Sequence, residues 1–493
     1  MLGARLDGVM AIDESTLRAR VLARPADDAP RLAYAEALEA RGEAEGAFVR
    51  ASVELARLAN DVGVWETELE TRAGLFARWT EANGPSHERF VDRVRDTRIA
   101  PVFRRGFVEG LDVPDPSVLH GALERLGDDL RLVRHLTIRA GLVDEVISLL
   151  GMFRDVVSLE LGGNVLSSPG LAEMLFSSDP MSRLRRLVVG RGSRIEGGLR
   201  ALAKRALPRL ETLDLSCSGA GDVGAKALAQ ARWTKSLRGL RMADAVLGPE
   251  GIRALVAAPN GWESLSTLDL GGNPLGAEGV TRLKPLRAPL VVLSLPAVEA
   301  DADSLRRLLE GRTFAARRLA RLSIDFAAVG DSLHEVLGPK SRSLRSLSAS
   351  SCGVGEKGLV ALLDLLEQSD PAPTSARERG APEVKTKAAS AGAARAPKRW
   401  NVSPLVALDL SVNPLGSLGL EHLADSYWAE SLVSLDVSFV PNANKASKLY
   451  LSRSLGARVR FGRDELASRE SREAHERPAS AFLDADAFAA FDD

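Results

Sequence analysis

Apolar residues along this chain change their spacing in a regular cycle, which is clearest between Leu265 and Leu283. Leu268 and Leu270 are two residues apart, the period of a β-strand, whereas Val280 and Leu283 are three apart, as on one face of an α-helix. The stretch therefore predicts a strand followed by a helix. Repetition of the cycle along most of the chain predicts an α/β fold built from many short strand–helix units.

The strand half of the cycle follows the template Leu-x-x-Leu-x-Leu-x-x-Asn-x-Leu, which is met or approximated eleven times. Successive first positions are 23 to 29 residues apart, except for one interval of 61 residues between Leu344 and Leu405. Such a period predicts a solenoid, in which each repeat buries its leucines only against its neighbours. The first positions are Val133, Val156, Leu184, Leu210, Leu237, Leu265, Leu290, Leu319, Leu344, Leu405 and Leu432.

The helix half of the cycle repeats a Gly-x-x-Gly-x-x-x-Leu pattern, which starts at Gly221, Gly248, Gly276, Gly355 and Gly416. With the strand template, it resembles the ribonuclease-inhibitor type of leucine-rich repeat over residues 130–440. The resemblance implies a horseshoe solenoid with parallel strands on the concave face and helices on the convex face. Template position 9 normally holds Asn, whose amide can bond the backbone of its own and neighbouring turns; Asn164, Asn273 and Asn413 keep it.

The N-terminal part of the chain has a different pattern, which predicts three short helices over residues 13–60. Residues 24–58 resemble the bacterial repeat-companion domain, a helical module found beside repeat arrays, although Glu36-Ala37 replaces its usual Asp-Trp pair. That family implies no chemistry. Arg31, Glu36 and Arg41 form either an exposed recognition patch or helix-surface ion pairs that orient the helices. The matching residues are Asp27, Asp28, Arg31, Leu32, Tyr34, Ala35, Leu38, Arg41, Gly42, Phe48 and Arg50.

These patterns predict five regions along the chain. Within the second region, residues 103–113 predict a strand pair or an irregular first strand, and a cap there would shield the end of the array from water. The regions are a helical repeat-companion-like module at 1–60, a connector and N-terminal cap at 61–130, a leucine-rich-repeat array at 131–440 with a disordered insertion at 369–400, a C-terminal cap at 441–463, and a charged, disordered tail at 464–493.

Composition adds limits on the partner and the compartment. With 65 basic and 66 acidic residues, the chain has no overall bias toward nucleic acid or an anionic membrane. No secretory signal and no membrane-length apolar stretch is found, so a cytoplasmic location and no membrane partner are expected. Abundant Arg and Ala indicate a bacterial source. Cys217 and Cys352 are expected to be free thiols, with Cys352 at ladder position 9.

In the implied fold, template positions 3, 5 and 7 face the concave surface. Position 5 is often charged, position 7 is mostly small, and the face is therefore expected to be shallow, polar and mildly acidic. Two interpretations stay open: a groove for a basic or polar protein surface, or aspartates that serve mainly to order neighbouring strands. The candidate binding residues are Glu160, Asp214, Arg241, Asp269, Asp409 and Asp436.

No catalytic constellation accompanies the repeats. The six histidines are scattered, and no metal-ligand spacing, phosphate loop or nucleophile motif is present. We therefore expect no enzyme activity, no catalytic residue, no metal, no cofactor and no small-molecule substrate. The prediction is a non-enzymatic protein–protein interaction scaffold. The alternative is a regulatory or effector protein whose repeats select a target for an activity that the sequence does not show.

Two further segments leave a choice open. Residues 371–399 hold seven Lys or Arg against two Glu, so the insertion either tethers an acidic partner or nucleic acid or is a solvated spacer. Without interleaved aromatic residues the spacer is favoured, and nucleic acid is not expected. The C-terminal SAFLDADAFAAFDD is either a short docking helix, a segment folded back on the chain, or a disordered tail.

Overall fold

The structure of the chain is a computed structural model in which two compact units follow each other in sequence. Unit 1 comprises the described residues up to Leu265, and unit 2 those from Ser266 onward. Residues 61–91 of the expected connector, the expected insertion at 369–400, the expected tail at 464–493 and Asn164 lie outside the described residues. The described residues are 14–60, 92–153, 155–162, 165–166, 169–177, 182–193, 195, 198–310, 318–338, 343–368, 405–426, 428–429 and 432–462.

Unit 1 contains a sheet whose strands follow each other in chain order. The first two form an antiparallel hairpin, as residues 103–113 predicted, and the following strands are parallel. The strands are β1 (Ala100–Arg104), β2 (Phe107–Val113), β3 (His135–Ile138), β4 (Ser158–Leu161), β5 (Arg186–Val189), β6 (Thr212–Asp214) and β7 (Gly239–Arg241).

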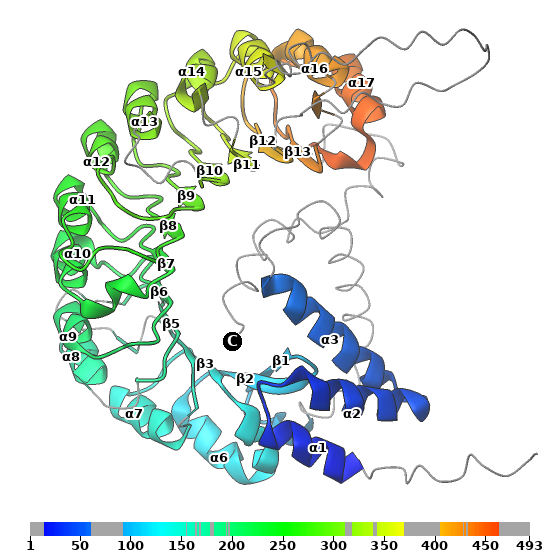
Figure 1. Cartoon of the computed structure of the whole chain (residues 1–493), viewed down its shortest axis with the longest axis vertical. Coiled ribbons are helices and arrows are strands. Elements are labelled where there is room, and N and C mark those ends of the chain that lie inside the picture. The colour runs from blue at the N-terminus through cyan, green and yellow to red at the C-terminus, as the bar shows by residue number, and fades with distance from the viewer. Residues whose placement is uncertain are drawn as a thin grey trace, which may run out of the picture. The chain divides into compact units, whose positions relative to one another are not determined.

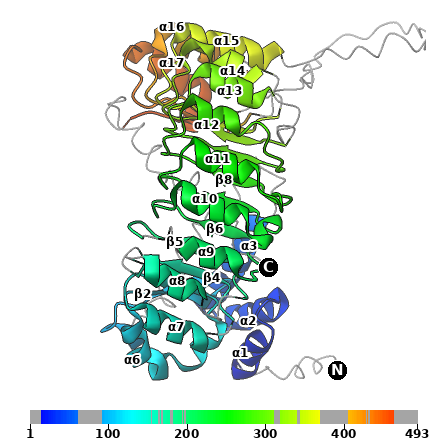
Figure 2. The same cartoon turned by 90° about the vertical axis from the view of Figure 1, so that its left-hand side faces the viewer.

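The helices of unit 1 fall into two groups. The first three precede the sheet, and the others alternate with strands and stack in chain order along one side of it (Figures 1 and 2). They are α1 (Glu14–Ala23), α2 (Asp28–Ala40) and α3 (Ala44–Asn60), then α6 (Pro116–Leu126), α7 (Val143–Met152), α8 (Pro169–Ser177), α9 (Gly198–Lys204), α10 (Gly221–Ala229) and α11 (Pro249–Val256), with 3-10 turns η1 (Gly127–Leu132) and η3 (Arg232–Lys235).

Unit 2 repeats the same alternation with a parallel sheet. Its strands are β8 (Thr267–Asp269), β9 (Val292–Ser294), β10 (Arg321–Ser323), β11 (Ser346–Ser348), β12 (Ala407–Asp409), β13 (Ser434–Asp436) and β14 (Val459–Arg460). Its helices are α12 (Gly276–Arg282), α13 (Ala302–Leu309), α14 (Leu333–Leu337), α15 (Glu356–Gln368), α16 (Gly416–Asp425) and α17 (Lys445–Leu455), with 3-10 turns η4 (Gly330–Ser332) and η7 (Gly456–Arg458). The predicted α/β alternation of strand and helix is confirmed.

The template leucines form the core of both units. In unit 2, Leu268, Leu270 and Leu275 of the opening stretch are at most 2% exposed, and Leu293 and Leu295 of the next repeat are fully buried. Each such side chain contributes about 2 kcal/mol when buried. The parallel register places Leu268 beside Leu293. One repeat therefore supplies the apolar surface that buries the next.

The Asn at template position 9 ties successive repeats together, as its sequence position predicted. Buried Asn413 accepts hydrogen bonds from the N–H groups of Cys352 and Val354, both at 3.0 Å, and its amide donates to the carbonyl of Ala349 at 2.7 Å. All three partners belong to the preceding repeat. The same amide donates to the carbonyl of Leu410 in its own repeat. One side chain thus satisfies backbone groups on two turns.

The second glycine of the helix pattern is needed because the preceding repeat packs against it. A Cβ on Gly358 would lie 2.6 Å from Cα of Asp331, closer than any side chain tolerates. Asp331 Oδ1 accepts the N–H groups of Gly355 at 2.8 Å and Gly358 at 3.0 Å. Asp222 makes the corresponding contact with Gly248 in unit 1. An aspartate from one repeat therefore caps the start of the next helix.

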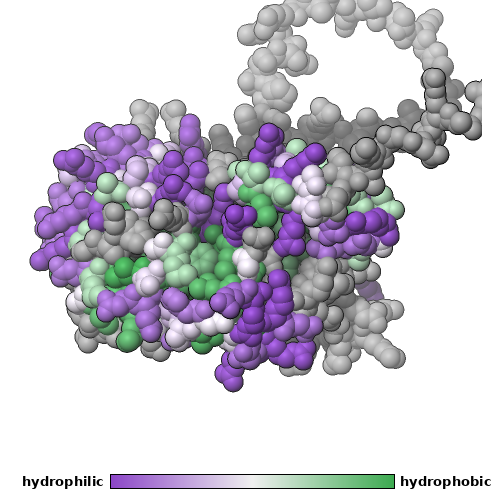
Figure 3. All heavy atoms as spheres, turned by 90° about the horizontal axis from the view of Figure 1, so that it is seen from below, coloured by the Kyte–Doolittle hydropathy of each residue, from purple (hydrophilic) through white to green (hydrophobic). Residues whose placement is uncertain are grey.

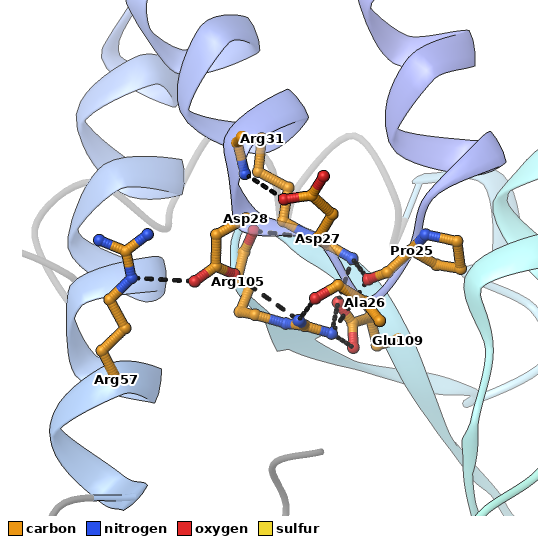
Figure 4. Close-up of polar contacts among 9 residues, drawn as sticks. Pro25, Ala26, Asp27, Asp28, Arg31, Arg57, Arg105 and Glu109 are labelled. Carbon is orange, nitrogen blue, oxygen red and sulfur yellow. Dashed lines mark hydrogen bonds and ion pairs between the residues drawn. The ribbon is translucent and has the colours of Figure 1, made fainter.

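Helices α1–α3 pack on the β1–β2 hairpin through a buried ion pair (Figure 4). Arg31 on α2 lies 2.7 Å from Glu109 on β2, and both side chains are essentially inaccessible to solvent. Arg31 also donates to the carbonyl of Pro25 and stacks over the ring of Phe107. Arg105 approaches the second carboxylate oxygen of Glu109 at 3.2 Å. The carboxylate of Glu109 thus pairs with the guanidinium groups of Arg31 and Arg105 where the helices meet the hairpin.

The location of Arg31 decides between the two interpretations of the N-terminal arginines. An exposed patch that contains Arg31 is wrong, because Arg31 is fully buried and holds the helices against the hairpin. Burial lowers its pKa to about 10, and the carboxylate of Glu109 acts in the opposite direction. Arg41 instead pairs on the surface with Glu14 and Glu43, while Glu36 is exposed. Ion pairs orient these helices, and the decisive one is internal.

The surface at the start of unit 1 is mixed. Seen from the side of α1 and α6, hydrophilic residues border a smaller hydrophobic area (Figure 3). Val102, Leu142 and Met152 are the large apolar side chains exposed in this part of the unit. None of the helices among the described residues is long and apolar enough to cross a membrane.

Replacing Arg31 by Met is expected to lower the free energy of unfolding by about 3 kcal/mol, because it removes one partner of a buried ion pair. Arg41→Met removes surface ion pairs with Glu14 and Glu43 and is expected to cost much less, because solvent screens exposed pairs. Urea denaturation of both variants measures the difference. Equal losses would show that the buried pair does not hold the helices in place.

Candidate functional site

The structure places the predicted position-5 residues in lateral rows across the strands. In unit 1, Glu160 lies beside Val188, Val188 beside Asp214, and Asp214 beside Arg241. In unit 2 the row runs Asp269, Ser294, Ser323, Ser348, Asp409, Asp436. Arg460 of β14 extends it beyond Asp436. Position 5 follows the buried leucine at position 4, so the rows lie on the sheet face opposite the leucine core. The repeat helices stack along one side of the sheet (Figure 1), and the face with the rows is called the open face below.

The four aspartates of these rows share a backbone contact that the sequence interpretation did not foresee. Each is the last residue of its strand, and its Oδ1 accepts the N–H of the residue two positions later. Such contacts are typical of Asp at turns. The pairs are Asp214 with Ser216 at 2.9 Å, Asp269 with Gly271 at 3.1 Å, Asp409 with Ser411 at 2.9 Å and Asp436 with Ser438 at 2.9 Å.

The backbone ladder explains why this N–H needs an acceptor. In the β12 repeat, the N–H of Leu410 donates to the carbonyl of Asp436, and the N–H of Val412 donates to the carbonyl of Ser438. Ser411 lies between these donors, and its N–H turns instead to Asp409. The aspartates therefore order the ends of their own strands. These bonds lie within one repeat, so the interpretation that the aspartates order neighbouring strands stays a prediction.

Glu160 does not serve the backbone in this way. The N–H two positions later, that of Gly162, donates to the carbonyl of Ile138 in the preceding repeat. Glu160 is 42% exposed in its side chain and lies 3.8 Å from Arg186. It is the one acidic candidate in the described rows whose carboxylate serves an ion pair instead of the strand end.

Asp325 adds a carboxylate to the open face, and it was not among the candidates selected from the sequence. It stands at template position 7, where most other repeats hold small residues. The next repeat has Ser348 at position 5, and Asp325 Oδ1 accepts both the hydroxyl of Ser348 at 2.6 Å and the N–H of Ser350 at 2.8 Å. An aspartate from the preceding repeat thus replaces the missing local acceptor. The signal was an Asp at position 7 before a repeat that lacks Asp at position 5.

The two units differ in charge on the open face. In unit 1, Arg186 at position 3 of β5 lies close to Glu160 and Asp214, whose carboxylates act against the burial that lowers the pKa of Arg186. Arg241 lies beside Asp214 in register. Opposite charges therefore alternate on unit 1. Arg186 was not among the predicted candidates because only position 5 was selected.

The open face of β10–β13 carries the three carboxylates of Asp325, Asp409 and Asp436 against two cations, Arg321 at position 3 of β10 and Arg460 of β14. Burial raises the pKa of Asp409, the bonds from Ser411 act in the opposite direction, and the neighbouring charges of Asp436 and Asp325 raise it further. Arg460 approaches Asp436 at 3.5 Å. The hydroxyls of Ser350 and Ser411 bond each other at 2.8 Å. The structure thus brings three carboxylates and several hydroxyls together on β10–β13.

A row of apolar residues lies next to these carboxylates, at template position 8. Phe326, Val412 and Phe439 have φ angles of 64°, 58° and 56°, the left-handed region that bulky residues rarely adopt. Each such residue costs about 1–2 kcal/mol relative to ordinary backbone. Their side chains are 64%, 48% and 63% exposed, so core packing does not offset that cost. Gly272 occupies the equivalent position in the β8 repeat with φ 65°.

His135 has no features of a catalytic base. Arg104 Nη1 lies 3.0 Å from its Nε2, so that nitrogen accepts and the imidazole is neutral. Burial lowers the pKa of His135 well below its ordinary value, and nearby arginines including Arg104 and Arg186 lower it further. Within the described parts of the chain, no group of three or more His, Cys, Asp or Glu side chains is arranged to hold a metal ion.

Cys352 has the ladder role that its position predicted. It is 2% exposed, its thiol donates to the carbonyl of Ile324 at 3.2 Å, and burial raises its pKa to about 11. Cys217 lies at position 8 of its repeat and is partly exposed. Both cysteines are free thiols, as expected.

The repeat geometry defines a solenoid of strand–helix units, and comparison with known proteins identifies the repeat. Residues 207–229 and 263–284 match the leucine-rich repeat family. The chain therefore carries leucine-rich repeats and has the α/β fold of a leucine-rich-repeat solenoid. The comparison with curated proteins found no match.

Two solved structures are similar in fold at low sequence identity. A chain of the Rad7 and Elc1 complex from yeast is 16% identical with a TM-score of 0.46, over 84% of this chain and 100% of that chain. An internalin (inlF) from Listeria monocytogenes is 16% identical with a TM-score of 0.29, over 59% of this chain and 64% of that chain. At these scores neither relationship informs function.

Replacing Asp409 by Asn is expected to stabilise the protein slightly at neutral pH. Because the pKa of Asp409 is higher in the folded protein than in the unfolded chain, its ionised form opposes folding above the folded pKa. This effect vanishes below the unfolded pKa of about 3.9. The advantage of the Asn variant should therefore shrink as pH falls from about 7 toward 4, measured by urea denaturation.

Asp409→Ala is the matched control, because Ala also removes the acceptor for Ser411. It should be less stable than the Asn variant by about 1 kcal/mol at each pH. An advantage of Asn over the parent that grows as pH falls would contradict the raised pKa of Asp409.

The two cysteines are expected to differ in reactivity. In the folded protein, an aromatic disulfide reagent at about pH 8 should modify Cys217 rapidly and leave Cys352 unmodified, because its thiol is buried and stays protonated. Denaturation should expose the second thiol. Rapid modification of Cys352 in the folded state would show that its repeat opens readily, and a Cys217→Ser variant makes the assignment direct.

Proposed function

We propose that this protein is a non-enzymatic interaction scaffold that binds a basic or polar protein surface on the open face of unit 2. Leucine-rich repeats bury their apolar residues between neighbours and leave one side of the sheet to a partner. The proposal includes a bacterial source, a cytoplasmic location, and a repeat-companion role for α1–α3 beside the array. Folds of this scaffold type are generally not enzymes.

The observation that carries the proposal is the concentration of Asp325, Asp409 and Asp436 on β10–β13. Burial is the main cause of the raised pKa of Asp409, and repulsion from the neighbouring carboxylates of Asp436 and Asp325 raises it further. A cationic partner would relieve that repulsion. The backbone contacts account for one oxygen of Asp409 and of Asp436, which leaves the net charge of each group in place.

The same observation narrows the six candidates chosen from the sequence. Asp409 and Asp436 stay the preferred contacts, and Asp325 joins them. Asp269 lies on β8, two strands before β10, whose repeat contains Asp325. Glu160, Asp214 and Arg241 belong to the charge-balanced face of unit 1, where Arg186 already supplies a cation. We therefore assign the contact to the last repeats of unit 2.

The Asp409→Asn, Asp436→Asn variant is expected to weaken partner binding roughly tenfold, because two charges that face a cationic surface are lost. Asn keeps an oxygen for the N–H of Ser411 or Ser438, so the strand ends stay intact. Affinity purification from the native organism, followed by quantitative mass spectrometry, compares the proteins captured by the parent and the variant.

The control is a Glu160→Gln, Asp214→Asn variant, which removes the same number of negative charges from unit 1. A partner of the proposed kind is captured by the parent and by this control but is depleted with the unit 2 variant, and its capture weakens at higher salt. Retention of every captured protein by the unit 2 variant would remove the acidic face of unit 2 as the binding site.

A further inference from the structure

The apolar row at Phe326, Val412 and Phe439, called the apolar strip below, has no explanation in the folding of unit 2. All three side chains are about half or more exposed, and all three residues hold left-handed backbone. The β8 repeat uses Gly272 at the same position and the β7 repeat uses Asp244, both common in this conformation. Folding alone would favour such residues on β10, β12 and β13 as well.

The ladder fixes the strip in line. The N–H of Phe326 donates to the carbonyl of Ser350 at 2.9 Å, that of Ser351 to Ser411 at 3.0 Å, and that of Val412 to Ser438 at 2.8 Å. The positions therefore follow the spacing of β10–β13, about 4.8 Å per strand, and span about 15 Å from Phe326 to Phe439. About four or five residues of an extended chain cover that length.

Each member of the strip follows an aspartate within one to three residues of the chain. Asp325 directly precedes Phe326, and Asp409 and Asp436 each stand three residues before Val412 and Phe439. Apolar and acidic side chains thus run side by side along the same strand ends. This pairing selects a partner that offers aliphatic or aromatic groups together with Lys or Arg, because such a segment buries the apolar strip and neutralises the acidic row at once.

We infer that the apolar strip and the row of Asp325, Asp409 and Asp436 form one binding edge for a short protein segment that combines basic and apolar residues. The inference rests on the proposed function, since it specifies the partner of the same face. It adds that charge alone does not account for binding. A purely basic segment would neutralise the acidic row but would leave the apolar strip exposed to solvent.

Three fluorescein-labelled synthetic peptides about twelve residues long test the inference with the full-length protein. One combines Lys and Leu in a Gly/Ser background, the second replaces each Leu by Ser, and the third replaces each Lys by Glu. Fluorescence polarisation at physiological ionic strength should show that the Lys/Leu peptide binds about tenfold more tightly than either matched peptide. Equal affinity for the Lys/Leu and Lys/Ser peptides would overturn the inference.

The decisive variant is Phe326→Asn, Phe439→Asn, because Asn tolerates left-handed backbone and the fold is preserved. Binding of the Lys/Leu peptide should fall about tenfold, to the level of the Lys/Ser peptide, without a loss of melting temperature. Val246→Asn is the matched control: Val246 of unit 1 is 68% exposed at φ 61°, and its replacement should leave binding unchanged. An equal loss with Val246→Asn would contradict a specific edge.

The charge variant Asp409→Asn, Asp436→Asn separates this inference from the proposed function. If it weakens both Lys peptides while the Phe variant weakens neither, the acidic face stands and the apolar edge is refuted. If neither variant has an effect, both proposals fail.

Two further measurements test whether residues 371–399 of this chain, or a second copy of the chain, occupy the edge instead of an external partner. Stronger peptide binding after deletion of residues 371–399, which hold seven Lys or Arg against two Glu, would show that this segment already occupies the edge. Dimerisation that is lost in the Phe variant, measured by light scattering, would assign the edge to a second copy. Either result would overturn the inference of an external partner. Unchanged peptide binding by the deletion variant, with a monomeric mass in light scattering, supports an external partner.

Discussion

Stacking of one repeat on the next is the interaction on which the rest of each unit depends. A repeat such as the one that begins with β9 has Leu293 and Leu295 on one side only, and they are buried because the neighbouring repeats supply the opposing surface. The strands of unit 2 are only two or three residues long. Hydrogen bonds must therefore continue beyond the strand, at Asn413 and at the left-handed residues of position 8, to hold the stack in register.

The need for hydrogen-bond partners at the strand ends also determines which residues occupy the candidate site. The N–H at position 7 requires an acceptor, and the chain supplies it with Asp409, with Asp436, or with Asp325 from the preceding repeat. Acidity on the open face is thus partly a consequence of backbone satisfaction, since Asn, Ser or Thr could also accept the bond. In unit 1 Arg186 and Arg241 equal the two acidic candidates in number, whereas the three carboxylates on the last repeats of unit 2 exceed Arg321 and Arg460 by one.

The fold could be predicted from the sequence because the leucine period records the stacking directly. The rows of position-5 residues followed as well, since alternate residues of a strand share a face and parallel strands stay in register. Features that depend on a partner far away in sequence could not be predicted in this way. Arg31 had the pattern of a helix-surface residue, and only its contact with Glu109, at the far side of a long connection, makes it internal. Asp325 was missed for a related reason, because its function lies in the next repeat.

Backbone conformation and exposure distinguish residues that stabilise the folded chain from residues that do not. Asp409 has a local use, so its presence alone says little about a partner. Phe326 and Phe439 are different: they are exposed, they hold a conformation that Gly or Asn adopts at lower cost, and they bury little of their own surface. Val246 of unit 1 has the same two features, so what distinguishes Phe326 and Phe439 is their alignment across β10–β13 in the same repeats as the carboxylates of Asp325 and Asp436. The acidic and apolar rows therefore carry unequal weight, and the apolar one distinguishes a binding edge from an ordinary strand end.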